Sequence, residues 1–337
     1  MRIINLVFIC VSLLAASCAL VPPNPFGVKK HSGLYQVYDD CKCGYIDRSG
    51  KVVVNPQFDS CNEFVDGLAP VSIGDKMGFI GTDGKFAINP QFDSASKFSE
   101  GLAVVWSGGK AGYIDTNGKY VVNPQFGGAS DFSEGLASVN IGEKSGFIDK
   151  TGKYIINPQF DSTGDFSEGL AAVKIGDRFG YVDRNGKIVI NPQFDYATNF
   201  KDGLAAVQTG DKYGFIDNAG KYIINPQFAT AEEFSEGLAH ISVKSGDELR
   251  NGFIDKSGKI IINPQFDGSG KFSDGLAWVS IGGKIGFVDK NGKYVINPQE
   301  LDNSGDFVDG VCPLFSKAID SSGKVIWKAL HPKVCGD

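Results

Sequence analysis

The sequence has few of the residues on which most enzyme and metal chemistry depends. Histidine occurs only 3 times in 337 residues, at His31, His240 and His331, and no two of these stand at the spacing of a shared site. No Gly-x-Ser-x-Gly motif precedes a helix, and there is no phosphate-binding glycine loop with lysine and no His-Glu-x-x-His zinc motif. We therefore expect no catalytic residues, no metal and no cofactor.

An excess of basic charge is also absent. Lysine and arginine number 33 against 39 aspartate and glutamate, which gives a net charge of −6, and no basic stripe is present. This argues against nucleic acid as a partner. Hydrophobic residues do not recur with the 3.6-residue period of a helix, so the sequence predicts an all-β chain.

One short pattern recurs along almost the whole chain. The triplet Asn-Pro-Gln returns every 34 residues, with a single step of 38. It begins at Asn55, Asn89, Asn123, Asn157, Asn191, Asn225, Asn263 and Asn297. A fixed period of this length indicates a repeat architecture.

Within one unit, apolar and polar residues alternate with the period of a strand. Residues 170–175, 180–183 and 188–190 are the three strands that we expect in the fifth unit. An Asp-x-x-Gly turn joins the second strand to the third, because Asp bonds nearby backbone N–H groups and Gly adopts a positive φ. We expect Pro192 to end the third strand, since proline lacks a ladder donor, and a short fourth strand to form in the crossing that follows.

Each three-stranded meander leaves one apolar face uncovered, which only the next unit can bury. Phe194 and Phe200, which flank the crossing, are the predicted contacts between units. Residues 33–327 then form one domain of nine units, the last of them partial. An alanine-rich first strand and a long crossing favour a β-propeller, whereas 34 residues is short for a four-stranded blade and leaves an open β-solenoid as the alternative.

The repeat resembles the WG-repeat family, also called KWG repeats, of bacterial proteins. Gly146–Asp149, Gly152-Lys153, Pro158–Phe160 and Phe166–Ala171 carry the match in one unit. The resemblance implies an all-β repeat in a surface or envelope setting more than it implies an activity. The tryptophan that names the family is missing before the glycine of the second strand. That position holds Cys43, Met77, Ala111, Ser145, Phe179, Tyr213, Asn251 and Ile285.

The first 17 residues have the pattern of a secretory signal, with Arg2 ahead of an apolar stretch. Cys18 follows a sequence like a bacterial lipobox, so we expect it to be the lipidated first residue of an envelope lipoprotein. Ordinary cleavage near Cys18 is the alternative. Residues 18–32 are then a tether and 328–337 a C-terminal tail. Membrane contact is expected only through this anchor.

The remaining cysteines lie in the first two units and near the end of the chain. We expect one or two disulfides, typical of an oxidising compartment, among Cys41, Cys43, Cys61, Cys312 and Cys335. A redox or metal role is the alternative, although Cys41-Lys42-Cys43 has no second close pair or nearby histidine.

Candidate binding residues are those in which one unit differs from the others, because the scaffold does not require them. The seventh unit has four extra residues within 244–251, and Glu248 and Arg250 there are either contact residues or part of a neutral insertion. Trp106 and Trp278, interpreted as equivalent positions after Gly-Leu-Ala, either bind a partner or pack. Recurring aspartates such as Asp149 are expected to cap turns, with calcium binding as the alternative.

Together these features predict a secreted, non-catalytic module that binds a protein or peptide. A glycan-binding module that uses the exposed aromatic residues, and a spacer without a specific ligand, are the alternatives.

Overall fold

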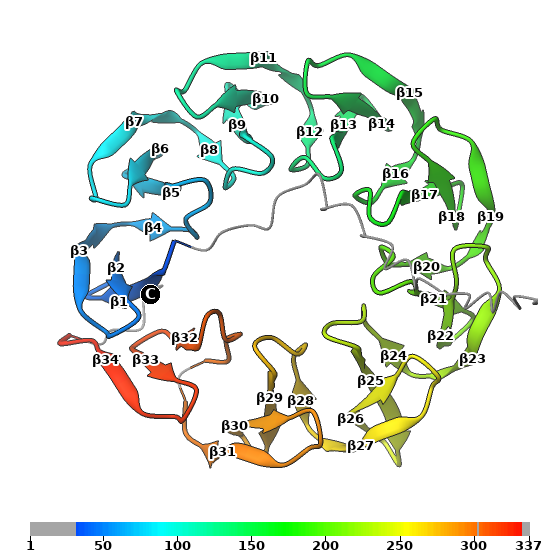
Figure 1. Cartoon of the computed structure of the whole chain (residues 1–337). Helices are drawn as coiled ribbons and strands as arrows, with labels where there is room; N and C mark the ends of the chain where they lie inside the picture. The colour runs from blue at the N-terminus through cyan, green and yellow to red at the C-terminus, as the bar shows by residue number, and fades with distance from the viewer. Residues whose placement is uncertain (1–31, 302, 332–337) are drawn as a thin grey trace, which may run out of the picture.

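The computed structural model describes residues 32–301 and 303–331, and it is a closed ring of nine small β-sheets (Figure 1). No helix occurs among the described residues, and so none there is long and apolar enough to cross a membrane. The sheets follow one another in chain order around the ring, as blades of a β-propeller.

The blades are numbered 1 to 9 in chain order. Blade 1 holds β1 (Leu34–Asp39), β2 (Lys42–Asp47) and β3 (Val52–Phe58); blade 2 holds β4 (Ser60–Cys61), β5 (Leu68–Ile73), β6 (Lys76–Gly81) and β7 (Phe86–Phe92); blade 3 holds β8 (Ser94–Ala95), β9 (Leu102–Ser107), β10 (Lys110–Asp115) and β11 (Tyr120–Phe126). Blade 4 holds β12 (Gly128–Ala129), β13 (Leu136–Ile141), β14 (Lys144–Asp149) and β15 (Tyr154–Phe160); blade 5 holds β16 (Ser162–Thr163), β17 (Leu170–Ile175), β18 (Arg178–Asp183) and β19 (Ile188–Phe194); blade 6 holds β20 (Tyr196–Ala197), β21 (Ala205–Thr209), β22 (Lys212–Ile216) and β23 (Tyr222–Phe228). Blade 7 holds β24 (Thr230–Ala231), β25 (Leu238–Ser245), β26 (Glu248–Asp255) and β27 (Ile260–Phe266); blade 8 holds β28 (Gly268–Ser269), β29 (Leu276–Ile281), β30 (Lys284–Asp289) and β31 (Tyr294–Gln299); blade 9 holds β32 (Val311–Pro313), β33 (Lys317–Asp320) and β34 (Val325–Lys328).

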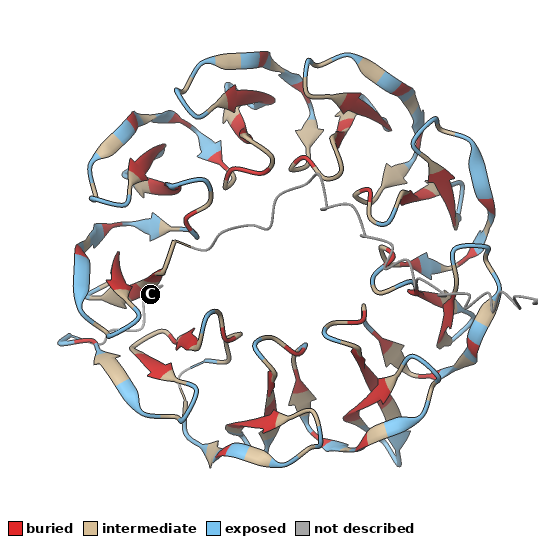
Figure 2. Ribbon diagram, viewed as in Figure 1, coloured by how far each residue is buried: buried red, intermediate tan, exposed pale blue. Residues whose placement is uncertain are grey.

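Every blade is an antiparallel meander. In blades 2 to 8 a two-residue strand comes first, followed by a tight hairpin of two longer strands and an outer strand on the periphery (Figure 1). The two-residue strands confirm the short fourth strand expected in the crossing. The middle strands are the most buried and the outer strands are largely exposed (Figure 2). We call the side of the ring that carries the hairpins between the two middle strands, such as 175–178, the hairpin face.

Neighbouring blades bury their apolar faces against each other. Between blades 5 and 6, Phe194 and Phe200 are both at most 2% exposed, and they pack with Tyr181 and Ile190 of blade 5 and Val207 of blade 6. Burial of one such ring is worth about 1.5–3 kcal/mol. The prediction that these phenylalanines join the units is confirmed.

The third strand of each unit is longer than the sequence suggested. β19 continues through Asn191 and Pro192 to Phe194, so the prediction that Pro192 ends the strand is wrong. Proline is tolerated because β19 is an outer edge strand and bulges at this point: Tyr181 pairs with Ile190, but Phe179 pairs with Phe194. The bulge crosses Gly180 so closely that a Cβ there would lie 2.4 Å from the Ile190 oxygen, which explains the repeated glycine.

Blades 1 and 9 meet and close the ring. Tyr35 and Val37 of β1 pack in one buried cluster with Val311 and Ala318 of blade 9. The His331 N–H donates to Asp39 Oδ1 at 2.6 Å across the same seam. A solenoid would leave these faces apart, so the preferred prediction of a propeller is confirmed, with nine blades.

One disulfide joins the first two blades. Cys43 of β2 is bonded to Cys61 of β4, as expected for two of the candidates. Cys312 is instead a free thiol, and this corrects the expectation that it is a disulfide candidate. It is fully buried between blades 8 and 9, and burial raises the pKa of its thiol to about 12. Cys18 and Cys335 lie outside the described residues.

Candidate functional site

The repeated aspartates cap their own turns. Asp149 Oδ1 accepts hydrogen bonds from Thr151 N at 2.9 Å and Lys153 N at 3.1 Å, and seven other units repeat this arrangement. The others are Asp47, Asp115, Asp183, Asp217, Asp255, Asp289 and Asp320. The interpretation as turn residues is confirmed. The described residues contain no group of three or more His, Cys, Asp or Glu side chains that would hold a metal ion.

The acidic residues of the Ser-Glu-Gly motif connect one blade to the next. Glu134 adopts a left-handed backbone, with φ at 53°, and its Oε2 accepts the Gly169 N–H of the following blade at 3.0 Å. Five further pairs repeat this bond: Glu100 with Gly135, Glu168 with Gly203, Asp202 with Gly237, Glu236 with Gly275 and Asp274 with Gly310. Sequence reasoning found the turn but missed this second role, because only the ring brings the two residues together.

The serine of the same motif forms a second link between blades. Ser167 Oγ donates to the Phe200 carbonyl of the next blade at 2.7 Å. Ser99, Ser133, Ser235 and Ser273 make the equivalent bond. In blade 6 this position is Lys201, so the link to Phe234 of blade 7 cannot form. The interface between blades 6 and 7 therefore departs from its neighbours.

Three aromatic residues also depart from the repeat in this part of the ring. Tyr196 stands where the strand registers place Ser60, Ser94, Gly128, Ser162, Thr230 and Gly268 in other blades. Its ring lies edge-on to Phe179 of blade 5 at 5.8 Å and to Tyr213 of blade 6 at 6.3 Å. Tyr196 remains 46% exposed.

Tyr196 and Tyr213 line a groove between blades 6 and 7, which we call the blade 6–7 groove. It has a volume of about 690 Å³ and is lined by Tyr196, Lys201, Tyr213, Glu232, Glu233 and Lys271, among others. A smaller hollow of about 250 Å³ continues it over blade 5 and shares Tyr196 and Glu233.

The two glutamates of the groove differ in their surroundings. Burial raises the pKa of Glu233 above its usual value, against the opposing effects of the Asn199 N–H, which donates to its carboxylate at 3.1 Å, and of Lys201. The neighbouring His240, whose Nδ1 lies 3.6 Å from Glu232 Oε1, instead lowers the pKa of Glu232. His240 Nε2 is held at 2.8 Å from Asn251 Oδ1, a contact that fixes the imidazole beside the groove.

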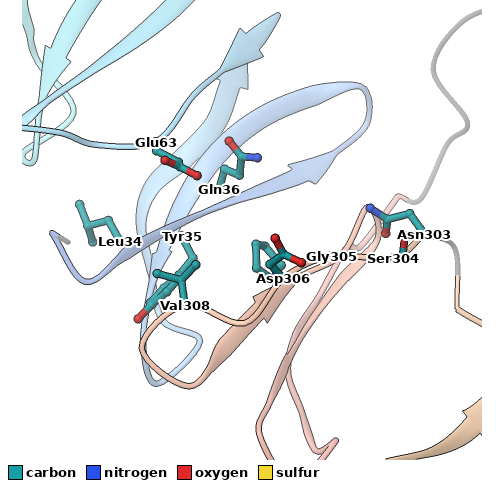
Figure 3. Close-up of a pocket in the computed structure, with 10 residues that line it drawn as sticks. Leu34, Tyr35, Gln36, Glu63, Asn303, Ser304, Gly305, Asp306 and Val308 are labelled. Atoms are coloured by element: carbon teal, nitrogen blue, oxygen red, sulfur yellow. The ribbon is translucent and has the colours of Figure 1, made fainter. Parts of the chain in front are cut away.

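A second hollow lies at the seam of the ring. It has a volume of about 290 Å³ and lies between β1 and residues 303–308 of blade 9, with Glu63 at one side (Figure 3). Asn303 in this hollow is already used structurally, since its Oδ1 accepts the Phe315 N–H at 2.7 Å.

The four extra residues of the seventh unit lengthen its hairpin. The middle strands of blade 7 have 8 residues each, against 6 in blade 5, and they stay paired out to Ser245 and Glu248. At about 3.3 Å per residue, the hairpin projects about 7 Å beyond its neighbours. Leu249 near its tip is 45% exposed.

Arg250 belongs to the scaffold and not only to the insertion. Its guanidinium contacts Glu248 and Asp267, and the Asp267 contact repeats those of Lys76 with Asp93 and Lys144 with Asp161 in other blades. Glu248 is the more exposed of the two candidates, with 67% of its side chain accessible.

The two tryptophans lie in separate blade interfaces and not in the groove. Trp106 packs with the cluster between blades 3 and 4, and Trp278 with the cluster between blades 8 and 9. They are not equivalent positions, which corrects the interpretation from the sequence: Trp106 pairs with Ala111, whereas Trp278 pairs with Phe287, two residues nearer the start of its strand. Both side chains are half-buried.

The closed ring of nine repeated meanders defines a β-propeller built from a single sequence repeat. The chain belongs to the WG containing repeat family, whose model matches it eight times between residues 44 and 314. The matched segments are 44–76, 77–110, 112–144, 146–178, 179–213, 213–244, 252–284 and 285–314. No curated protein matches the chain.

Several solved structures have a distantly similar architecture. One is Hsv2p of Kluyveromyces lactis, at 10% identity and a TM-score of 0.43, over 69% of this chain and 94% of that one. Another is the type-IX secretion component PorZ of Porphyromonas gingivalis, at 10% identity and a TM-score of 0.33, over 86% of this chain and 50% of that one. A third is the extracellular domain of the putative hybrid two component system BT4673 of B. thetaiotaomicron, at 11% identity and a TM-score of 0.39, over 77% of this chain and 45% of that one.

Proposed function

We propose that this propeller is a non-catalytic module that binds a protein or peptide at its hairpin face. The observation that carries the proposal is the blade 7 hairpin, which projects beyond its neighbours and presents Leu249 and Glu248. A projecting apolar side chain beside a carboxylate provides an anchor and a polar contact, a combination found at protein interfaces.

The rest of the hairpin face supports docking of a protein. Four shorter hairpins each expose an isoleucine, between 41% and 48% accessible: Ile73, Ile141, Ile175 and Ile281. The repeated bonds within each blade do not require these side chains to be apolar, because they lie at the hairpin ends. Apolar residues repeated at one level around a ring give a partner several anchors at once.

We also propose that the protein is exported and held in the cell envelope by a lipid on Cys18. The signal-like pattern of residues 1–17 supports export, and the Cys43–Cys61 disulfide is typical of an oxidising compartment. Mass spectrometry of the mature N-terminus tests the anchor: a diacylglyceryl-modified Cys18 is expected, and an unmodified Cys18 or a later start contradicts it.

A shortened hairpin tests the docking proposal. Removal of 244–245 and 248–249 leaves Val243-Gly246-Asp247-Arg250, which has the length of the blade 5 hairpin and keeps Arg250 beside Asp267. We expect purified wild-type protein to capture a specific protein from an envelope extract and the shortened protein to lose it. The conservative Arg250→Lys variant, which restores the lysine of other blades, should capture it normally.

The position of contact gives a second readout. A photoreactive benzophenone amino acid at 249 should form discrete covalent adducts in whole cells, and the same group at Val189 on the outer strand of blade 5, which is 44% exposed, should not. Equal capture by the wild-type and shortened proteins, or adducts of equal yield at both positions, would contradict docking through this hairpin.

A further inference from the structure

We propose that the blade 6–7 groove is a binding site for a neutral carbohydrate chain. This site is separate from the hairpin tip of the proposed protein interface and does not depend on it. The proposal rests on three observations: an aromatic floor that the fold does not require, a lysine in place of the serine that links most blades, and a balance of charge along its walls.

The aromatic floor consists of Tyr196 and Tyr213. Six other blades form the same sheet with serine, glycine or threonine at the Tyr196 position, so its ring is not needed for folding. At 46% exposure it leaves a large apolar and hydroxyl-bearing surface open to solvent. Phe179 supports this ring from blade 5, and the Lys174 ammonium lies 5.7 Å from the centroid of Phe179. Sugar rings present C–H faces that pack on aromatic rings, and their hydroxyls bond to groups at the edge.

The groove has a lysine where most blades have the linking serine. In blades 3, 4, 5, 7 and 8 the motif serine binds the carbonyl of the next blade, as Ser235 does with Phe272 at 2.7 Å, whereas blades 2 and 9 have valine at this position. Lys201 replaces that serine in blade 6 and lines the groove together with Glu233. The groove of about 690 Å³ falls within the usual range for ligand sites, and the 250 Å³ hollow over blade 5 extends it in the direction of a chain.

The walls of the groove carry equal numbers of acidic and basic side chains. Glu232 and Glu233 supply two carboxylates, and Lys201 and Lys271 supply two ammonium groups. A strongly charged ligand would meet groups of its own sign as well as of the opposite sign, which offsets its attraction. A polyhydroxylated neutral ligand both donates to the carboxylates and accepts from the lysines, so it satisfies both kinds of group.

The repeat itself supplies variants that keep the fold. Tyr196→Ser places the residue of blades 2, 3 and 5 into blade 6, and Tyr213→Ser places the residue of blade 4 there. Met77→Ala changes the Tyr213-equivalent position in blade 2, far from the groove, to the residue of blade 3, and it is the matched control. Circular dichroism and thermal melting of each variant verify the fold.

Calorimetric titration of the intact protein with cello-, malto-, laminari- and chitohexaose tests the site. We expect wild-type protein to bind at least one of them with a Kd below about 1 mM. Tyr196→Ser should weaken that binding about tenfold or more, because it removes the exposed ring, while Met77→Ala should leave it unchanged. The shortened blade 7 hairpin should also bind normally, so this result is independent of the protein interface.

Three results would overturn the proposal. The first is the absence of heat of binding with all four hexasaccharides at millimolar concentration. The second is equal affinity in wild-type and Tyr196→Ser protein. The third is a highly sulfated heparin hexasaccharide or a peptide that binds in the groove more tightly than the neutral sugars, which would show that charge or backbone recognition governs the site.

Discussion

Gly50, in the turn between β2 and β3 of blade 1, lies directly against the carbonyl oxygen of Ile326 in β34 of blade 9. A Cβ on Gly50 would be only 1.9 Å from that oxygen. The equivalent glycines of the other turns approach a valine or isoleucine side chain of the preceding blade at 2.8–3.2 Å. One contact thus repeats around the ring, and it is tightest where the two ends of the propeller meet.

Gly50→Ala should weaken the closure of the ring. A left-handed backbone costs alanine about 1–2 kcal/mol, and the clash with a backbone oxygen adds about 1–3 kcal/mol more. Gly67→Ala is the matched control, because Gly67 has a similar φ of 80° but has no atom within 4 Å of the added Cβ. Urea denaturation measures the loss of unfolding free energy in Gly50→Ala and in Gly67→Ala. Equal losses of stability in the two variants would show that the seam contributes nothing.

The inter-blade bond of Glu134 makes a separate prediction. Glu134→Ala leaves the half-buried Gly169 N–H without its acceptor, which should cost about 1–3 kcal/mol of unfolding free energy. Glu134→Gln keeps an oxygen that can accept the Gly169 N–H, and its backbone must adopt the same left-handed conformation. Its loss of unfolding free energy should therefore be less than half that of Glu134→Ala. Chemical denaturation of the wild-type protein, Glu134→Ala and Glu134→Gln measures these differences in unfolding free energy. Arg184 Nη1 also lies 3.9 Å from Glu134 Oε2. If glutamine is as destabilising as alanine, this ion pair, and not the hydrogen bond, carries the effect.

The scaffold could be predicted because each of its local sequence features recurs in many units. The Asp-x-x-Gly turn, the strand at 170–175 and the burial of Phe194 follow from residues that recur in the units, and the structure confirms them. Residues 170–173 are all buried, because both faces of this strand pack in apolar clusters, so burial does not alternate along it. The extension of the third strand through Pro192 was missed, since the bulge around Gly180 depends on a register between two strands that no local pattern specifies.

The candidate site was predicted less well, for a physical reason. Sequence differences identified Glu248 and the tryptophans, which are conspicuous residues, but the groove carries three modest changes that all lie in blade 6. Tyr196, Lys201 and Tyr213 gain significance only when the fold places them around one groove with the glutamates of blade 7. A position-by-position comparison of blades 2 to 8 gives the signal for Tyr196, because the other six have serine, glycine or threonine there.

The disulfide between blades 1 and 2 should stabilise the ring near its seam. Cys43 and Cys61 are separated by 18 residues, and closing a loop of that length is worth about 3 kcal/mol in the chain-entropy account. A double Cys43→Ala and Cys61→Ala variant installs the pair found between blades 3 and 4, Ala111 and Ala129, so packing is preserved. Guanidinium denaturation should show the loss, with an unchanged circular dichroism spectrum.

Non-reducing peptide mapping is the control for that prediction. Wild-type protein should yield one cross-linked fragment that contains Cys43 and Cys61. If all of the wild-type protein yields this cross-linked fragment and the alanine variant still has the wild-type free energy of unfolding, the bond does not stabilise the ring.

Asp165 predicts a stability gain that depends on pH. Burial, with a smaller effect from Asp131, raises the pKa of Asp165 above its usual 3.8, opposed by the hydrogen bond from Ser130. The folded state therefore holds this proton more tightly than the unfolded chain does, and the associated stability is present at low pH and is lost as the pH rises through the folded pKa. Asp165→Asn removes the buried charge and should raise Tm at pH 7, on the order of 1 °C.

The gain from Asp165→Asn should shrink as the pH falls through the folded pKa of Asp165 and vanish below 3.8, where the wild-type carboxyl is protonated in both states. Asp149→Asn is the matched control of opposite sign. The hydrogen bond from Thr151 lowers the pKa of Asp149, so the ionised form stabilises the fold at neutral pH and that stability disappears as the pH falls through the folded pKa. Thermal melts of the three proteins from pH 7 to pH 3 should therefore show a positive difference from wild type for Asp165→Asn that vanishes in acid, and a negative difference for Asp149→Asn that persists until the pH falls toward the lowered pKa of Asp149. A gain for Asp165→Asn that persists unchanged at pH 3 would mean that shape, and not charge, explains it.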